Sequence, residues 1–206
     1  MRLPNEAHDS HRWLIGEIAP DFTLLDVWAL PVGGRRDDFD AFLAALAFFD
    51  PAHTGTTLTR FLFWLRLRAG ALLGWDDPTK ERRIPGCSES SLAVRVPDAL
   101  ADTAEDHAIS NAMRTTAGGF TPLYKTDDEW AAEISNDTVH GVMHLAWVQQ
   151  PDGRYRAQMG VYVKPRGWFG RVYLKCIEPF RHLIVYPALT RQVGRMWRAT
   201  VADVTP

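Results

Sequence analysis

Apolar and polar residues alternate along two parts of the chain in the pattern typical of β-strands. Residues 22–32, FTLLDVWALPV, lie between Pro20 and Gly33-Gly34 and predict the first strand. Residues 139–165, VHGVMHLAWVQQPDGRYRAQMGVYVKP, contain two alternating runs joined through Pro151-Asp152-Gly153, which predicts an antiparallel hairpin. One side of this hairpin is predicted to be apolar and the other more polar. The apolar side comprises Val139, Gly141, Met143, Leu145, Trp147, Tyr155, Ala157, Met159, Val161 and Val163.

The segment TDDEWAAEISN, residues 126–136, fits either a helix or a strand. Thr126 and Glu129 have the spacing of a helix capping box, whereas Asn136-Asp137 suits a turn into the following strand. A two-stranded hairpin is marginally stable alone and needs neighbours to form a stable sheet. We therefore interpret this segment as a further strand.

Helical periodicity replaces the alternation after Asp37. The first predicted helix carries the apolar stripe Phe39, Phe42, Leu43, Leu46 and Phe49. A second helix is predicted over residues 57–73, and the side opposite its main stripe carries Phe63, Trp64 and Leu67. We interpret this second helix as covered on both sides, with contact to a membrane or a partner protein as the alternative.

Residues 75–119 predict a long connecting region, because periodicity there is weak and limited to a helical stretch between Pro97 and Met113. Long connections of this kind are commonly either lids or insertions.

The segment CIEPFRHLIVYPALTRQVGRMW, residues 176–197, predicts a helix with two bends. The helix is expected to be interrupted near Glu178-Pro179, since a residue before proline avoids the helical conformation, and Pro187 is expected to cause the second bend. Arg181 is predicted to point away from the apolar stripe of the new segment. That stripe comprises His182, Tyr186, Leu189, Val193 and Trp197.

This order of elements predicts a single α+β domain over residues 1–206, with helices packed on one face of an antiparallel sheet. The prolines let the C-terminal helix curve, which predicts a cavity between that helix and the apolar side of the sheet. The alternative is ordinary close packing, with His182 hydrogen-bonded in the core. The predicted ligand-binding residues are Trp28, Met143, Leu145, Trp147, Met159, Val161, Tyr173, Phe180, His182 and Tyr186.

The composition narrows the class of protein. An apolar fraction of 46% and a charged fraction of 23% are typical of a globular protein, and a net charge of -2 argues against a nucleic-acid partner. The polar N-terminus and the absence of a long apolar run predict neither a signal peptide nor a transmembrane segment. Cys87 and Cys176 match neither a disulfide scaffold nor a zinc site, so we expect free thiols in a cytoplasmic protein.

Few residues suggest catalysis. His140 and His144 would suit a metal on a helix, but on a strand they lie about 13 Å apart, so no metal and no cofactor are expected. Motifs of nucleophilic hydrolases and of phosphate-binding loops are absent. The best acid–base candidates are His182 and Tyr186, assisted by Asp26 or His144 if the sheet brings either of them near.

The stretches GRVYLKCIEPFRHLIVYPAL, EISNDTVHGVMHLAWV and FTLLDVWALP resemble an uncharacterised bacterial family, a domain of unknown function related to the START and polyketide-cyclase-like (SRPBCC) helix-grip superfamily. The resemblance extends from about Trp13 to Trp197. It implies an antiparallel sheet that grips the C-terminal helix around a pocket for hydrophobic small molecules. Relatives carry histidine directly after Pro-Phe, whereas this chain has Arg181 there and His182 next.

Three functions follow as hypotheses. The first is non-catalytic binding of a hydrophobic or aromatic small molecule in the predicted cavity. The second is a cyclase-like or dehydratase-like enzyme that uses His182 or another pocket histidine as a general base. The third is an interaction or membrane-peripheral module that acts through the helix at residues 57–73.

Overall fold

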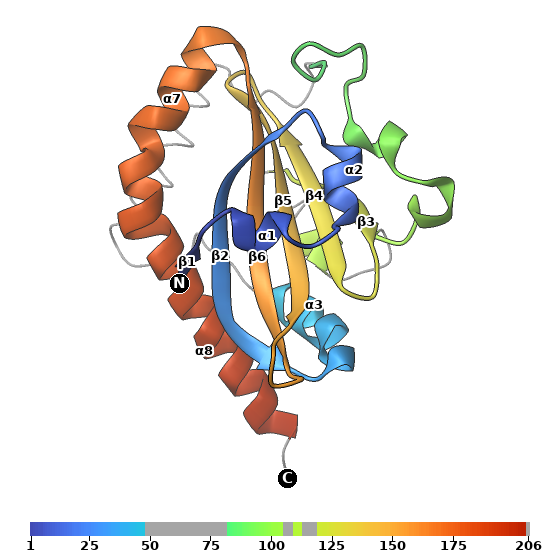
Figure 1. The fold of residues 1–206 in the computed structure, drawn as a ribbon, viewed down its shortest axis with the longest axis vertical. Helices are drawn as coiled ribbons and strands as arrows, with labels where there is room; N and C mark the ends of the chain where they lie inside the picture. Colours follow the sequence, from blue (N-terminus) through green and yellow to red (C-terminus); the bar gives the residue numbers. More distant parts are fainter. Residues whose placement is uncertain (48–81, 105–108, 113–118, 205–206) are drawn as a thin grey trace.

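The computed structural model describes residues 1–47, 82–104, 109–112 and 119–204. These residues form an α+β fold, as predicted, with a six-stranded antiparallel sheet in the order β1-β2-β6-β5-β4-β3 (Figure 1). The strands are β1 Arg2–Leu3, β2 Thr23–Gly34, β3 Thr121–Lys125, β4 Glu129–Ser135, β5 Val139–Gln149 and β6 Tyr155–Pro165. The α-helices are α1 Glu6–Asp9, α2 Leu14–Ile18, α3 Phe39–Ala47, α7 Gly167–Phe180 and α8 Tyr186–Val204. The helix predicted at 57–73, with Phe63, Trp64 and Leu67, lies outside the described residues, as does Phe49.

The predicted strands are confirmed, and the 126–136 segment is indeed a strand, β4. The Asn136 side chain closes the turn into β5 because its Oδ1 accepts hydrogen bonds from the backbone N–H groups of Thr138 and Val139, at 2.9 and 3.0 Å. In the β5–β6 hairpin Gly153 has a φ of 79°, a conformation that glycine adopts without strain. Sequence patterning missed the short β1, which pairs with β2 ahead of the predicted first strand.

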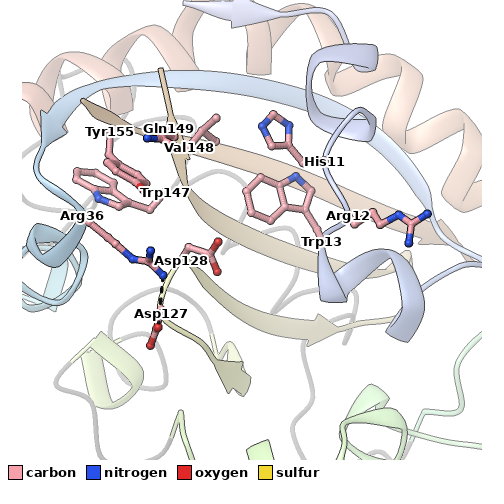
Figure 2. Close-up of a pocket in the computed structure, with 10 residues that line it drawn as sticks. All are labelled: His11, Arg12, Trp13, Arg36, Asp127, Asp128, Trp147, Val148, Gln149 and Tyr155. Carbon is pink, nitrogen blue, oxygen red and sulfur yellow. Dashed lines mark ion pairs between the residues drawn. The ribbon is translucent and has the colours of Figure 1, made fainter. Parts of the chain in front are cut away.

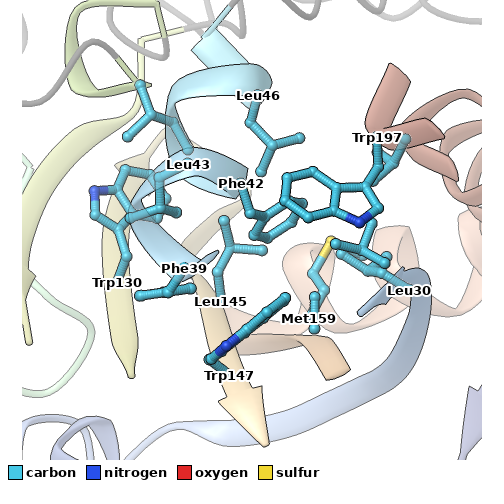
Figure 3. Close-up of a cluster of buried hydrophobic side chains, with 14 of the residues drawn as sticks. Leu30, Phe39, Phe42, Leu43, Leu46, Trp130, Leu145, Trp147, Met159 and Trp197 are labelled. Atoms are coloured by element: carbon cyan, nitrogen blue, oxygen red, sulfur yellow. The ribbon is translucent and has the colours of Figure 1, made fainter. Parts of the chain in front are cut away.

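The two faces of the sheet are covered by different segments, and both are apolar. On the helix face, α3 and α8 pack against the strands, and Figure 3 shows Phe42 against Trp147 and Trp197 in this core. The opposite face was predicted to be more polar, but it is buried under the N-terminal segment and residues 84–100. The prediction was wrong because it assumed that one face of the hairpin is exposed to solvent. A strand with both faces covered carries apolar side chains at successive positions. The buried side chains of the opposite face include Trp13, Ile15, Ile84, Leu92, Tyr124, Val142, Ala146, Val148 and Tyr162.

The part of residues 75–119 that the structure describes is therefore well packed. It contains two short 3-10 helices, Leu92–Arg95 and Asp98–Leu100, and it buries Leu92 and Val96 against the sheet. Within this part the packing is that of a structural cover over the second core rather than of a free lid.

The interruption of the C-terminal helix lies between the two predicted positions, Pro179 and Pro187. Helix α7 continues through Pro179 to Phe180, and a π-helical segment, Arg181–Val185, separates it from α8. Within that segment the N–H of Tyr186 bonds to the carbonyl of Arg181, five residues back. Pro187 has no N–H for the carbonyl four residues earlier, and its ring crowds that carbonyl, so the wider π turn in front of it relieves both problems.

Gly170 seats the start of α7 against the sheet. A Cβ atom at this position would overlap with the backbone carbonyl oxygen of Thr138 and lie 3.3 Å from Pro165. We expect Gly170→Ala to lower the free energy of unfolding by about 2 kcal/mol, because the backbone must move. Urea denaturation measures this change. The control is Gly16→Ala in α2, where nothing lies within 4 Å, so stability should rise by up to about 1 kcal/mol. Equal stability of Gly170→Ala and the wild type would contradict this contact.

Candidate functional site

A buried carboxylate lies where β2 meets the π segment. The side chain of Asp26 is 1% exposed and faces the helices. His182 Nε2 lies 2.5 Å from Asp26 Oδ1, and Arg181 Nη1 lies 3.1 Å from Oδ2. Arg2 Nη2 approaches Oδ1 to 3.6 Å. The wider π turn allows consecutive side chains to reach the same carboxylate, so the prediction that Arg181 points away from the stripe that carries His182 is wrong.

Two aromatic residues complete this cluster. The ring of Tyr186 lies 5.0 Å from that of Trp28 and 6.2 Å from that of His182, measured between ring centroids. Burial raises the pKa of the Tyr186 hydroxyl well above its usual value, and the negative charge of Asp26 raises it further. Tyr186 therefore stays neutral at physiological pH. We name Asp26, Trp28, Arg181, His182 and Tyr186 the joint cluster.

Three buried polar atoms of the joint cluster have no hydrogen-bond partner. They are Asp26 Oδ2, Trp28 Nε1 and Arg181 Nε. The contact between Arg181 and Asp26 Oδ2 is thus an ion pair without hydrogen-bond alignment. Buried polar atoms are satisfied in the great majority of cases, and an orphaned one is costly. The cluster therefore has one hydrogen-bond acceptor and two donors that a polar group from outside the cluster could satisfy.

The burial of the side chains on the helix face decreases beside Asp26. Asp26 pairs with Val161 across the sheet and Val161 pairs with Met143, and both apolar side chains are half-buried. The neighbouring row, Trp28–Met159–Leu145, is buried. Met143 and Val161 thus pack against the core but are less completely buried than the row next to them.

The residues predicted to bind a ligand divide along this gradient. Leu145, Trp147 and Met159 belong to the close-packed helix-face core, together with Trp28 and Tyr186 of the joint cluster. Met143, Val161, Tyr173 and His182 are half-buried, and Phe180 is exposed. His182, Tyr186 and Asp26 come together as the sequence suggested, whereas His144 lies on the other face of the sheet.

That other face holds a polar network that sequence reasoning did not assemble. His144 Nε2 lies 3.0 Å from Glu129 Oε2, and its Nδ1 lies 3.1 Å from His8 Nε2. Glu129 also accepts hydrogen bonds from the Tyr124 hydroxyl at 2.8 Å and the Leu14 N–H at 3.0 Å. His8 and His144 are fully buried. This network ties the N-terminal segment to β4 and β5.

A second histidine–glutamate pair lies on the same face. His140 Nε2 is 2.8 Å from Glu133 Oε2, and Glu133 also accepts hydrogen bonds from the Ser91 hydroxyl and from the Leu92 N–H. The two glutamates and the two strand histidines each stand four residues apart in apolar strands, and that shared spacing was the available signal. Each histidine has its own glutamate, and among the described residues no group of three His, Cys, Asp or Glu side chains is arranged to hold a metal ion.

A separate pocket of about 460 Å³ lies at the end of β5, between the N-terminal segment and the β3–β4 turn (Figure 2). Trp13 stacks on His11 on one side, and Trp147 stacks on Tyr155 on the other. Its ion pair, Arg36 with Asp127 at 3.9 Å, is largely exposed and thus screened by solvent. Trp147 borders this pocket rather than the joint cluster. The pocket lining comprises His11, Arg12, Trp13, Arg36, Asp127, Asp128, Trp147, Val148, Gln149 and Tyr155.

Comparison with known proteins places the chain in a family. Neither the curated proteins nor the solved structures contain a significant match to the sequence. The profile of one protein family matches residues 18–188, a range that includes the joint cluster apart from the approaching Arg2. The chain therefore belongs to the family described as protein of unknown function, DUF2867.

Proposed function

We propose that this protein binds a hydrophobic small molecule that carries one polar group. The polar group would bond to the joint cluster, and the apolar part would lie against Met143 and Val161 beside α7. The observation that carries this proposal is the set of unpartnered buried atoms, Asp26 Oδ2, Trp28 Nε1 and Arg181 Nε, next to half-buried apolar side chains. Ligand sites typically combine an apolar wall with a few convergent polar groups.

The architecture supports the same proposal. An antiparallel sheet with a long C-terminal helix against one face resembles the helix-grip domains of the START and polyketide-cyclase-like superfamily, to which we assign the fold. Such a domain would hold its ligand between the sheet and the helix, beside Asp26, where Met143 and Val161 are half-buried. Fold alone does not determine function, so the argument depends on the polar atoms.

The pair of His182 and Asp26 favours acid–base catalysis as a second candidate. With Nε2 directed to Asp26 at 2.5 Å, the Nδ1 atom of His182, which lies 3.9 Å from the half-exposed carboxylate of Glu178, is the nitrogen that would take a substrate proton. The carboxylate would orient the imidazole and stabilise its protonated form, as a general base requires. Tyr186 stays neutral and would act as a hydrogen-bond donor in this reaction.

Two matched probes test the binding proposal. We expect β-naphthol, an aromatic probe with one hydroxyl group, to bind at least tenfold more tightly than naphthalene in a fluorescence titration, because its hydroxyl bonds to Asp26. Asp26→Asn should reduce this preference to less than threefold. Met143→Lys should weaken both probes, whereas Val94→Lys, at a side chain that is 70% exposed, should weaken neither.

Equal affinities for the two probes in the wild type would contradict the polar part of the proposal. Failure of both probes to bind would contradict the site itself. Native mass spectrometry of protein purified without denaturation then identifies the natural ligand class from any retained molecule. The second candidate predicts that His182→Ala loses turnover of a substrate that the wild type converts but still binds β-naphthol. This result separates catalysis from binding.

A further inference from the structure

The outer side of the C-terminal helical run carries a continuous exposed stripe. Helices α7 and α8 form one curved run along the side of the molecule, with the sheet against its inner side (Figure 1). Exposed residues recur along it every three or four positions, apart from the eight-residue step across the half-buried Pro187. They are Trp168, Val172, Cys176, Phe180, Leu183, Arg191, Arg195, Arg198 and Ala202.

The α7 half of this stripe is apolar. Trp168 is 70% exposed, Val172 48%, Phe180 49% and Leu183 77%. Of the fourteen residues of α7, Gly170 alone is buried. Large apolar side chains that gather on one exposed helix side are typical of a contact surface, because single exposed residues are common but rows of them are not.

The α8 half of the stripe is cationic. Arg191, Arg195 and Arg198 are exposed and lie one turn apart. Residues 167–204 contain six lysine and arginine residues and two carboxylates, Glu178 and Asp203, in a chain whose net charge is -2. Positive charge is therefore concentrated on this helical run.

The π segment lies between the two halves of the stripe. Regular α-helix drifts out of phase with a stripe whose steps are mostly four residues, because its repeat is about 3.6 residues per turn. A π turn takes up more residues than an α turn, so the turn at Arg181–Val185 reduces this drift between Leu183 and Arg191. The same turn directs Arg181 and His182 inward.

We infer that this stripe binds the surface of a membrane that contains anionic lipids. Apolar α7 side chains would insert at the level of the headgroups, where tryptophan is favoured, and the three arginines of α8 would contact the lipid phosphates. Such a helix lies on the bilayer instead of crossing it. Among the described residues no helix is long and apolar enough to span a membrane.

Charge selects this occupant over two others. A second copy could pack its stripe against this one in two ways. With the helices antiparallel, the apolar half of each stripe would face the arginines of the other copy. With the helices parallel, the arginines of the two copies would face each other. A nucleic acid would complement the arginines but leave Trp168 and Leu183 in water. An anionic bilayer complements both halves. This inference goes beyond the proposed ligand site and does not depend on it.

Vesicle co-sedimentation of the full chain tests the inference. We expect the partition coefficient on vesicles of phosphatidylcholine mixed equally with phosphatidylserine to exceed that on phosphatidylcholine alone at least tenfold, and to fall as salt is added. The triple variant Arg191→Gln, Arg195→Gln, Arg198→Gln should lose at least tenfold on the mixed vesicles. For the double variant Trp168→Ser, Leu183→Ser, the partition coefficient should fall at least tenfold on both kinds of vesicle.

The control variant Arg12→Gln, Arg154→Gln removes two exposed arginines elsewhere and should bind within twofold of the wild type. Thermal unfolding tests whether each variant is folded. If the triple variant is unfolded, the three single variants replace it, and the partition coefficient of each on the mixed vesicles should fall at least twofold. Wild-type protein that stays in the supernatant overturns the inference, and so does equal loss in the control. Concentration-dependent dimerisation in ultracentrifugation, lost in the double variant and without vesicle binding, would assign the stripe to a second copy instead.

Discussion

Replacing Glu129 with alanine is expected to lower the free energy of unfolding by about 4 kcal/mol. The substitution leaves three buried donors without an acceptor: the Leu14 N–H, the Tyr124 hydroxyl and the ring of His144. Burial raises the pKa of Glu129, but the hydrogen bond and electrostatic interaction with His144 and the bonds from Leu14 and Tyr124 together lower it more than burial raises it. The carboxylate is therefore charged at neutral pH and holds these groups together.

Urea denaturation of Glu129→Ala and of a matched neighbour measures this effect. Asp128→Ala removes an exposed carboxylate whose side chain bonds to Thr126, so we expect a loss of about 0.5 kcal/mol or less. Glu129→Ala should also release the N-terminal segment first, seen as faster amide exchange at residues 8–15 than in the sheet. A loss of less than about 1 kcal/mol in Glu129→Ala would show that the network does not stabilise the fold.

Acidification is expected to destabilise the protein through His8. Burial, and after it the neighbouring His144, lowers the pKa of His8 to about 4. The unfolded chain binds this proton near pH 6.5, so stability is lost as pH falls from about 6.5 to about 4 and the loss levels off below that. By linkage this one group removes about 3 kcal/mol between pH 7 and pH 4.

Comparison of His8→Gln with the wild type isolates this contribution, since glutamine keeps hydrogen-bonding groups near His144 and Gln158 but has no proton to bind. We expect the pH dependence of the unfolding free energy between pH 7 and pH 4 to be smaller in His8→Gln by about 3 kcal/mol. The exposed His11→Gln should follow the wild-type curve. Parallel curves for His8→Gln and the wild type would mean that His8 does not remain neutral in the folded protein.

The two faces of the sheet thus have different tasks. The Glu129 and Glu133 networks fasten the N-terminal segment and residues 82–104 to one face, where His140 Nδ1 is the unpaired atom among the described side chains of the two networks. The joint cluster on the other face keeps buried atoms unpaired, although Arg2, Arg181 and His182 all approach Asp26. Hydrogen-bonding groups with partners inside the protein suit a structural contact, whereas groups without such partners suit a site that binds a ligand.

Local pattern was sufficient for much of the fold. Alternation predicted β2, β5 and β6, and the position of Pro151-Asp152-Gly153 predicted their hairpin, because side-chain direction in a strand depends on neighbours along the chain. Helical spacing after Asp37 predicted α3, and the need of a hairpin for further strands predicted β4. His182 and Tyr186 were found because one turn of helix separates them.

The sequence by itself therefore determined the α+β class, the central strands and the C-terminal helix that carries His182. The tertiary structure alone decided that Asp26, 156 residues away, meets His182, and that His8 meets His144, 136 residues away. It also decided that Arg181 turns inward and that the supposed polar side of the hairpin is a second core. Periodicity along the chain specifies the direction of each side chain, but the partner that arrives from a distant segment depends on how the layers pack, and that information is not local.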